Sequence, residues 1–466
     1  MRRTLALWLL LFGVYAATLG LSAFGNSDYA GDEPHYLLAA ESIVEDGNVD
    51  VLDEYAERAY TDFYPYRLRP HGHTTEGRLN EPHGVGFPLF IAPAYALGGA
   101  TGVELFLAAI AALAVALAYR LALRVAPDPW ALGAAVAVGL SPPFLAYGSA
   151  VYPELTAGAA LAGAALLALR LRERVARPDA FACFALLGAL PWLGTKFVAA
   201  GVVIGAVAVR ALWQGQRRTL AVGAVELSLF SLALYVAFNE ALYGGPTPYA
   251  ADVSGESATD TSSPGGYLER SYRLVGLFID REYGLLRWAP LFVLAFVGLW
   301  WLWHSHRERL SQAVPGVREI ELSAALCAAA LGAQLVVAAF VAPTMFGFWF
   351  PPRHLLAGLP LAVPLVAMGL RHMPRIGSAL AGLTVAGSAW LYAEVRWGDG
   401  SFVGDRPDAP FGPLTDLLPL FEPGGGWPFL LAGTVGIAVL ALVLREARAA
   451  RHSRQMAGAT RAKYSG

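Results

Sequence analysis

The sequence has 466 residues, of which 56% are hydrophobic and 15% are charged, and its mean hydropathy is +0.48. This composition leaves too little polar surface to cover a soluble globule of this size, so it excludes an ordinary water-soluble protein and indicates that lipid replaces water over much of the surface. The formal net charge of -2 excludes a general electrostatic attraction to nucleic acid.

Apolar segments that can cross a bilayer recur along the whole chain. The first, residues 4–24, follows two arginines as in a signal peptide, but no small-residue cleavage site precedes the polar segment after it, so we expect a retained helix of about 20 residues. The prediction is an all-α polytopic membrane protein with about 12 transmembrane helices in a single transmembrane domain, residues 1–466. The further predicted spans are residues 102–123, 130–147, 153–169, 180–194, 197–212, 219–242, 285–303, 320–341, 355–370, 376–395 and 427–444.

Arginine clusters orient these spans, because short cytoplasmic loops carry an excess of basic residues. All clusters fall on one side of the predicted topology, which is then the cytoplasm, together with both termini and a tail at residues 446–466. This topology requires the proline-bearing apolar segment 84–98 to lie on or dip into the outer face rather than cross. The clusters comprise Arg2 and Arg3, Arg120 and Arg124, Arg170, Arg172, Arg174 and Arg177, Arg217 and Arg218, Arg307 and Arg309, Arg371 and Arg375, and Arg445, Arg448, Arg451 and Arg454.

Three polar segments remain for the opposite, non-cytoplasmic face: residues 25–83, 243–283 and 396–426. The first is the largest. Its apolar residues recur at helical spacing from Tyr36 to Val44, which predicts an amphipathic helix at the membrane interface. No polar stretch is long enough to fold as a separate soluble domain.

Two adjacent carboxylates, Asp32 and Glu33, directly follow the first predicted span, and Pro34 suits the first turn of a helix. Carboxylates at a helix start commonly cap the helix, and the spacing alone leaves that interpretation open. Their place at the membrane interface favours another, because lipid and aromatic neighbours that exclude water raise the pKa of a carboxylate toward the range of a general base. Asp32 and Glu33 are therefore candidate catalytic residues.

An aromatic run, residues 346–350, leads into Pro352, Arg353 and His354, where a helix is predicted to re-enter the membrane from outside. A helix N-terminus favours anions, so an arginine at this place would form a phosphate site. The alternative is an arginine that extends to the lipid headgroups, since aromatic residues are common at the interface in either case.

Glu104, Glu154 and Lys196 lie near the outer ends of predicted spans, where a charge is costly in lipid. Charges retained at such places usually face a cavity or pair with one another. A Glu154–Lys196 pair that lines an outward-facing cavity and a purely structural ion pair are both open interpretations.

The first outer loop also holds His71, His73 and His83, but their spacing matches no metal site. We therefore expect solvated loop side chains and no metal. Cys183 and Cys327 lie in apolar runs without a Cys or Cys/His metal spacing, so neither a disulfide nor a structural zinc ion is expected.

Asp32, Glu33 and Tyr36 form an Asp-Glu-x-x-Tyr motif just after the first span, and this arrangement resembles the GT-C superfamily of lipid-linked-sugar glycosyltransferases. The most similar families by this pattern are the protein O-mannosyltransferases and the aminoarabinose transferases of lipid A. One departure is Glu81-Pro82, where aminoarabinose transferases place a lysine before a proline, so Arg353 becomes the candidate for phosphate binding. Further segments that are similar to superfamily members are residues 83–88, 152–154, 191–192, 280–286 and 352–356.

The resemblance implies a GT-C-like bundle that transfers a hexosyl or pentosyl unit from a polyprenyl-phosphate-linked donor to an acceptor hydroxyl, with inversion, on the outer face of the plasma membrane. It implies membrane lipids and a glycan, lipid or protein acceptor as partners, without nucleic acid, cofactor or metal. In this scheme Asp32 is the base, and Glu33 orients the acceptor or supports Asp32. The donor phosphate would contact Arg353 and Lys196, and the cavity or acceptor contacts would be Tyr36, His83, Glu154 and His354.

A polytopic transporter or lipid flippase is the main alternative, because such bundles also bury charges. No inverted repeat is apparent, and the candidate charges cluster toward one face, which favours the transferase. A non-catalytic protein of cell-envelope assembly is a further alternative.

Overall fold

The computed structural model of the chain describes residues 1–464 apart from positions 76, 252–263, 309, 311–313, 315, 405–411, 413–415 and 422–425. Arg309 and parts of the predicted outer loops 243–283 and 396–426 therefore lie outside the described residues. Within the described residues the protein is helical, and its only strands form one small antiparallel hairpin. The predicted all-α class is confirmed.

The helices follow one another along the chain with connections of very different length, from one residue to the stretch that holds the hairpin. Those of the first half are α1 (Arg2–Ala16), α2 (Glu33–Glu45), α3 (Leu52–Glu57), α4 (Gly86–Ala122), α5 (Trp130–Gly139), α6 (Pro142–Tyr147), α7 (Glu154–Glu173), α8 (Arg177–Leu193), α9 (Val198–Gln214) and α10 (Arg218–Tyr243). Those of the second half are α11 (Pro264–Glu269), α12 (Arg273–Ile279), α13 (Leu285–Trp288), α14 (Val293–Arg307), α16 (Val317–Val336), α17 (Arg353–Leu356), α18 (Leu359–His372), α19 (Pro374–Trp397) and α21 (Trp427–Tyr464). Strand β1 (Thr74–Thr75) pairs with β2 (Arg78–Leu79), and the short helix η2 (Thr195–Phe197) precedes α9.

Among the described residues, 7 helical segments are long and apolar enough to cross a membrane, which makes the chain a multi-pass membrane protein. They are Gly86–Ala122, Glu154–Glu173, Thr195–Gln214, Arg218–Ala250, Val317–Val341, Pro374–Trp397 and Trp427–Glu446. Helices α5 and α18 are apolar but shorter. The total of about 12 spans stays a prediction.

Proline accounts for one difference from the predicted spans, and glycine for one agreement with them. The predicted span 130–147 is divided into α5 and α6, because Pro142 and Pro143 begin a new helix. The segment 84–98 is helical from Gly86 and runs into the next predicted span within α4, but Gly98 and Gly99 break this helix. Gly99 has φ 59° and ψ −150°, a conformation essentially restricted to glycine.

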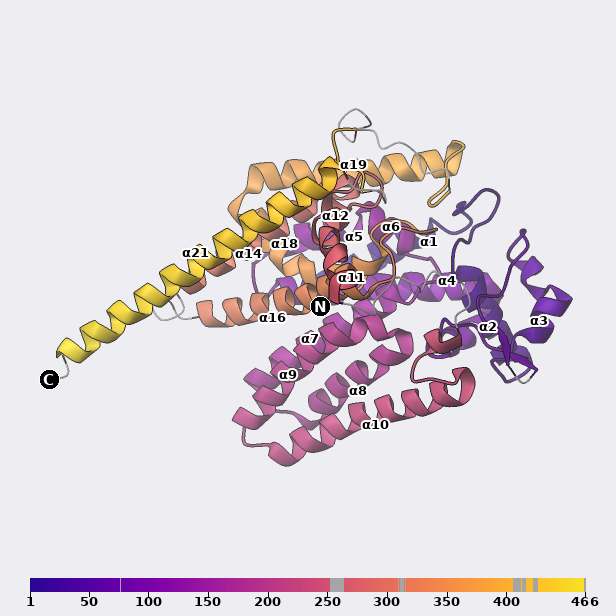
Figure 1. Cartoon of the computed structure of the whole chain (residues 1–466), viewed down its shortest axis with the longest axis horizontal. Coiled ribbons are helices and arrows are strands. Elements are labelled where there is room, and N and C mark those ends of the chain that lie inside the picture. The colour runs from indigo at the N-terminus through magenta and orange to yellow at the C-terminus, as the bar shows by residue number, and fades with distance from the viewer. Residues whose placement is uncertain are drawn as a thin grey trace.

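The helices form a bundle (Figure 1). Its two largest apolar cores lie between these helices. One core joins α1, α4, α5, α14 and α18, and the other joins α7, α8, α9 and α16. Helices α14 and α18 cross in close contact, because a Cβ on Gly298 would meet the Leu365 carbonyl oxygen and one on Gly369 would meet that of Leu294. Small residues at a crossing let two backbones approach, as is common between membrane helices.

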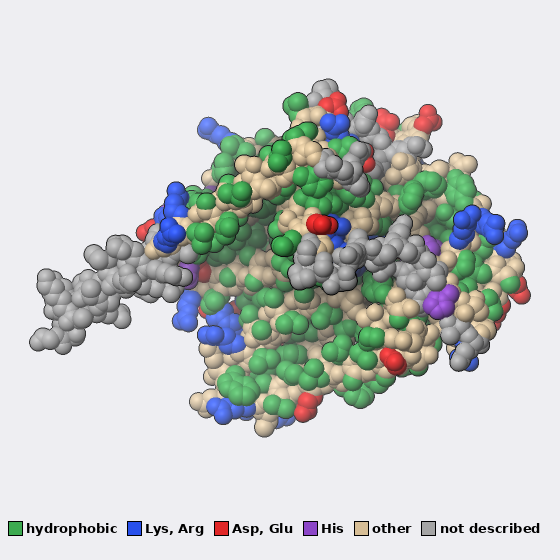
Figure 2. All heavy atoms as spheres, viewed as in Figure 1, with side chains coloured by type: hydrophobic (Ala, Val, Ile, Leu, Met, Phe, Trp, Pro, Cys, Tyr) green, Lys and Arg blue, Asp and Glu red, His purple; other side chains and the backbone are tan. Residues whose placement is uncertain are grey.

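The outer surface of the bundle is apolar, as a lipid-facing surface should be. Along α10 the side chains of Val222, Leu229, Phe230 and Phe238 are each at least half exposed. Figure 2 shows hydrophobic side chains across the broad middle of one face, with most charged side chains toward its ends. Exposed apolar helix faces of this extent agree with a membrane environment.

Residues 25–83, predicted to be the first outer loop, fold as a compact cap at one end of the bundle, around α2 and α3 (Figure 1). Its own small core includes Leu38, Val51, Tyr60 and Leu79. The predicted helix of this loop is confirmed as α2, but it has no exposed polar face over its first ten residues, because every residue from Glu33 to Ser42 is buried; its place at the membrane interface stays a prediction. Helix α2 packs on α4 and so fixes the position of the residues at its start.

Candidate active site

Asp32 occupies the N-cap position of α2, but its side chain makes no capping hydrogen bond. Instead, Oδ2 of Asp32 lies 2.7 Å from Nη2 of Arg353. The helix-cap interpretation therefore does not describe this carboxylate, and the side chain is directed at the second predicted site residue.

Arg353 is 5% exposed and joins two carboxylates, since its Nε donates to Oε1 of Glu154 at 2.8 Å. Its guanidinium lies 4.2 Å from the centre of the Tyr152 ring and 5.3 Å from that of Trp349. Both aromatic faces favour a cation held away from water. Arg353 is the first residue of α17, as the sequence predicts, but this helix is a single turn and so can contribute only a small dipole.

Glu154 continues this chain of charges to Lys196. Lys196 Nζ donates to Oε1 of Glu154 at 2.7 Å, so the same oxygen accepts from Lys196 and Arg353. The side chain of Glu154 is 0% exposed and stands in the first turn of α7, whereas Lys196 lies in η2. The predicted Glu154–Lys196 pair is confirmed as a contact.

Asp32, Arg353, Glu154 and Lys196 thus form an alternating network of two carboxylates and two cations, which we call the ion-pair network. Its inner members are buried, while the side chain of Asp32 is 23% exposed and that of Lys196 is 22% exposed. The network therefore presents an accessible carboxylate at one end and an accessible ammonium at the other. An anionic substrate with a reacting hydroxyl nearby needs that pair of groups.

The expected rise in the pKa of Asp32 is wrong. Burial does act to raise this pKa, but the Arg353 guanidinium opposes it and holds the pKa of Asp32 well below its ordinary value. Burial instead dominates at the neighbouring Glu33 and raises its pKa to about 8. Asp32 is ionised while it is paired with Arg353.

The hydrogen bonds of Glu33 hold neighbouring backbone segments in place. Its Oε2 accepts the Ala30 amide at 2.8 Å and its Oε1 accepts the Val151 amide at 2.8 Å, with the residue only 3% exposed. These bonds tie the start of α2 to the segment before α7 that carries Tyr152. With both oxygens used by the backbone, the predicted role in supporting Asp32 fits better than direct contact with an acceptor.

Glu104 is a neighbour of Glu33. It is 8% exposed and lines a pocket with Glu33, Tyr147 and Tyr152. Among the described residues Glu104 forms no ion pair, so the structure does not bring it into the ion-pair network.

Tyr36 and His354, two of the predicted contact residues, flank the ion-pair network. Tyr36 is buried one helical turn after Asp32, and its ring lies 5.5 Å from that of His83 and 6.5 Å from that of Tyr152. The ring nitrogens of His354 are buried and have no hydrogen-bond partner among the described residues. The roles of both residues stay predictions.

The segment 280–286, which the sequence singled out, supports the loop that carries Arg353. Asp280 is fully buried and accepts the backbone amides of Glu282, Tyr283 and Phe421. Tyr283 then donates its hydroxyl to the Gly347 carbonyl at 2.8 Å. This motif therefore positions the aromatic segment rather than contacting the ion-pair network.

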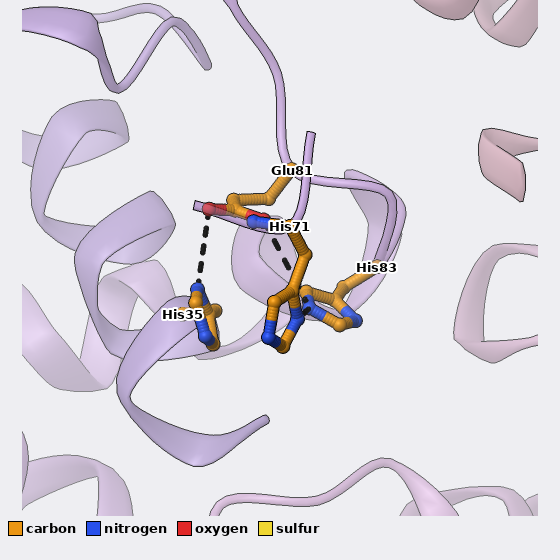
Figure 3. Close-up of side chains that lie close together, drawn as sticks. All are labelled: His35, His71, Glu81 and His83. Atoms are coloured by element: carbon orange, nitrogen blue, oxygen red, sulfur yellow. Dashed lines mark hydrogen bonds and ion pairs between the residues drawn. The ribbon is translucent and has the colours of Figure 1, made fainter. Parts of the chain in front are cut away.

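A second group of polar side chains lies in the first outer loop, where His35, His71, Glu81 and His83 converge (Figure 3). Their candidate ligand atoms all lie within 4.8 Å of one another. The interpretation of the loop histidines as solvated is wrong for His71 and His83, which are half-buried in this group, and holds for the exposed His73.

Burial lowers the pKa of His83 to about 4. Burial opposes ionisation of Glu81 as well, but hydrogen bonding to His35 and the nearby histidines bring its pKa down to about 2. His35 and Glu81 were not singled out as site residues from the sequence. The sequence signal that could have identified them is the number of potential metal-ligating side chains within the polar segment 25–83.

No family model and no curated protein sequence matches the chain. Among solved structures, the chain is similar to ArnT from Cupriavidus metallidurans in the apo state, with 15% identity and a TM-score of 0.48 over 83% of this chain and 64% of ArnT. It is also similar to the apo oligosaccharyltransferase of Archaeoglobus fulgidus, with 13% identity and a TM-score of 0.43 over 89% of this chain and 59% of that one.

A third similar structure is AglB from Archaeoglobus fulgidus in complex with an inhibitory peptide and a dolichol-phosphate, with 14% identity, a TM-score of 0.44 and the same coverage. These proteins are GT-C glycosyltransferases, the superfamily that the sequence motifs resemble. The chain covers less than two thirds of the length of each. A shared fold does not establish a shared activity, so the residues of the site decide the function.

Proposed function

We propose that the protein is a membrane glycosyltransferase that moves a sugar from a polyprenyl-phosphate-linked donor to an acceptor hydroxyl on the non-cytoplasmic face, with inversion. The observation that carries the proposal is the ion-pair network, in which Asp32 and Lys196 stay partly exposed on either side of the buried Arg353–Glu154 pair. A base and a cation held in one site are the two groups that this reaction requires.

The reaction needs no general acid to protonate the leaving group. The acceptor hydroxyl gives its proton to Asp32 as its oxygen forms the new bond to the anomeric carbon. The bond between that carbon and the phosphate oxygen breaks, and its electron pair leaves on the polyprenyl phosphate. Because a phosphate is a good leaving group once its charge is neutralised, a nearby cation replaces the acid that a glycosidase supplies.

The low pKa of Asp32 in the unliganded site is compatible with its role as the base, because Arg353, which causes the low pKa, would also bind the incoming phosphate. An incoming phosphate competes with Asp32 for the guanidinium, and Lys196 is the accessible cation that attracts the phosphate first. As Arg353 shifts its hydrogen bonds toward the phosphate, the pKa of Asp32 rises, because burial then acts with less opposition. Donor binding would therefore make Asp32 a stronger base.

Glu154 keeps the two cations in place before the donor arrives. With no exposed surface, its carboxylate offsets the charges of Arg353 and Lys196, which would otherwise repel each other at the edge of the membrane. Glu33 and Tyr152 position this arrangement. The tail of the donor would lie along the apolar helix faces, which suit a polyprenyl chain.

A lipid flippase is the alternative that uses the same charges. Purified protein reconstituted in liposomes with polyprenyl-phosphate-linked sugars separates the two functions. The proposal predicts release of free polyprenyl phosphate together with a glycosylated acceptor, in amounts that scale with enzyme. Movement of intact lipid-linked sugar between leaflets, without release of polyprenyl phosphate, would favour the flippase.

A further inference from the structure

We propose that His35, His71, Glu81 and His83 bind a divalent transition-metal ion, and that Zn²⁺ is the ion whose preferred ligands they match. The four side chains come from three places in the first outer loop: α2, the segment before the hairpin, and the segment before α4. This inference goes beyond the transferase function and does not depend on it. It also departs from the expectation that the chain holds no structural zinc.

The distances within the group are those of a nearly assembled site. Nδ1 of His71 lies 3.0 Å from Nε2 of His83, and the candidate ligand atoms all lie within 4.8 Å of one another. Two ligands at about 2.0–2.1 Å from one tetrahedral zinc ion are roughly 3.3 Å apart. Shifts of about 1 Å would therefore bring the four groups onto one ion.

The chemical types of the ligand atoms indicate which metal ion would bind. Imidazole nitrogens and one carboxylate suit zinc and its first-row neighbours, whereas calcium and magnesium prefer sites made only of oxygen. Each neutral imidazole has one lone pair to give, and its proton then sits on the other ring nitrogen. The Glu81 carboxylate supplies the negative charge that partly neutralises the ion.

Further hydrogen bonds fix the orientation of the proposed ligands, as residues around the ligands commonly do at metal sites. The Tyr55 hydroxyl donates to Oε1 of Glu81 at 2.5 Å and lies 2.8 Å from Nδ1 of His35. Oε2 of Glu81 accepts the backbone amide of His71 at 3.1 Å. The rings of His35 and His71 are 4.1 Å apart between centres, so they face the same small volume (Figure 3).

A metal ion here would connect residues 71–83, at the end of the first outer loop, to the start of α2. His35 lies one helical turn after Asp32, so an ion bound by His35, His71 and Glu81 would restrain the helix end that presents Asp32. The loop has only a small apolar core of its own, and small units of this kind are commonly stabilised by a structural metal.

Metal analysis of the purified full-length protein tests this proposal. The protein is prepared in detergent without chelator and with an affinity tag that contains no histidine, and bound zinc is measured by mass spectrometry. We expect about one zinc per chain. His71→Ala and His83→Ala should each lower the content at least tenfold, whereas the control His73→Ala, an exposed histidine of the same loop, should keep it.

A second measurement uses only the wild-type protein, in case the ligand variants fold poorly. After removal of metal with a chelator, added Co²⁺ should give the visible absorption of a tetrahedral cobalt site, and Zn²⁺ should displace it. Wild-type protein without zinc and without a cobalt spectrum would overturn the proposal, as would equal zinc contents in wild type and His71→Ala. Asp32→Asn should keep its zinc, so the metal proposal and the transferase proposal can fail separately.

Discussion

Nη2 of Arg353 lies 2.7 Å from Oδ2 of Asp32, which connects the start of α2 with the start of α17. Because Nε of the same guanidinium bonds Glu154, one buried cation holds two carboxylates at fixed positions. The geometry of Asp32 therefore depends on residues that lie far away in the sequence, and substitutions at any member of the ion-pair network should affect the others.

Replacing Glu154 by Gln should destabilise the fold strongly. The change leaves Arg353 and Lys196 as two cations beside a single carboxylate, and removing one partner of a buried ion pair costs about 3–5 kcal/mol. Thermal unfolding in detergent measures the effect. Adding Lys196→Met to Glu154→Gln should restore part of the lost stability, and strictly additive losses in the double variant would argue against the coupling.

Lys196→Met should weaken donor binding more than turnover. Lys196 is the partly exposed cation of the ion-pair network, and a charge-assisted hydrogen bond to a phosphate contributes about 1.5–3 kcal/mol, which corresponds to a rise in donor KM of roughly 10- to 100-fold. Steady-state kinetics with a lipid-linked sugar series measure this, with Lys196→Arg as the variant that keeps the charge. A donor KM equal to that of the wild type would remove Lys196 from the phosphate site.

The stability that Asp32 contributes should depend on pH only in acid. Burial acts to raise the pKa of Asp32, but Arg353 holds it well below the unfolded value of about 3.9, so the folded protein binds this proton more weakly than the unfolded chain does. The contribution is complete above about pH 5 and is lost as the pH falls toward the folded pKa. The difference in unfolding temperature between wild type and Asp32→Asn should therefore stay constant from pH 8 to pH 5 and shrink below about pH 4. A difference that changes between pH 8 and pH 6 would show that the pKa of Asp32 is raised.

The crossing of α14 and α18 should not tolerate added volume. A Cβ on Gly369 would collide with the Leu294 carbonyl oxygen, so Gly369→Ala should lower stability by about 1–3 kcal/mol. Gly382→Ala in α19 is the matched control, since a Cβ there meets nothing within 4 Å and alanine favours the helix. Comparable unfolding temperatures for the two variants would mean that α14 and α18 pack less closely at their crossing than the structure shows.

The sequence predicted most of the candidate site because membranes penalise unpaired charge. Asp32, Glu154, Lys196 and Arg353 stand out as ionisable groups at the outer ends of apolar segments, and such groups either pair or face a cavity. The Glu154–Lys196 pair could be anticipated, but the pairing of Arg353 with Asp32 and Glu154 could not. The pKa of Asp32 depends on whether Arg353 or water faces it, and only the folded arrangement settles that.

The histidine and glutamate group could not be predicted from spacing. Its ligands stand at positions 35, 71, 81 and 83, and the fold of the first outer loop brings them together without a local motif. The helical class followed from composition and apolar periodicity, whereas span limits failed where backbone chemistry acts locally. The example is the helix start at Pro142, which does not change the apolar character of the segment, whereas the break at Gly98 and Gly99 coincides with the predicted limit between residues 84–98 and 102–123.

Transfer of sugar by Asp32→Asn is the most direct measurement of the central claim. The variant keeps the shape of the side chain but removes the carboxylate, and general-base catalysis typically contributes about 10²- to 10⁴-fold, so kcat should fall by at least 100-fold. Asp46→Asn is the control, because Asp46 is exposed at the opposite end of the same helix α2. We expect near-wild-type transfer for Asp46→Asn and residual transfer for Asp32→Asn in a protein that still elutes as a folded species. Undiminished transfer by folded Asp32→Asn would contradict the assignment of Asp32 as the base.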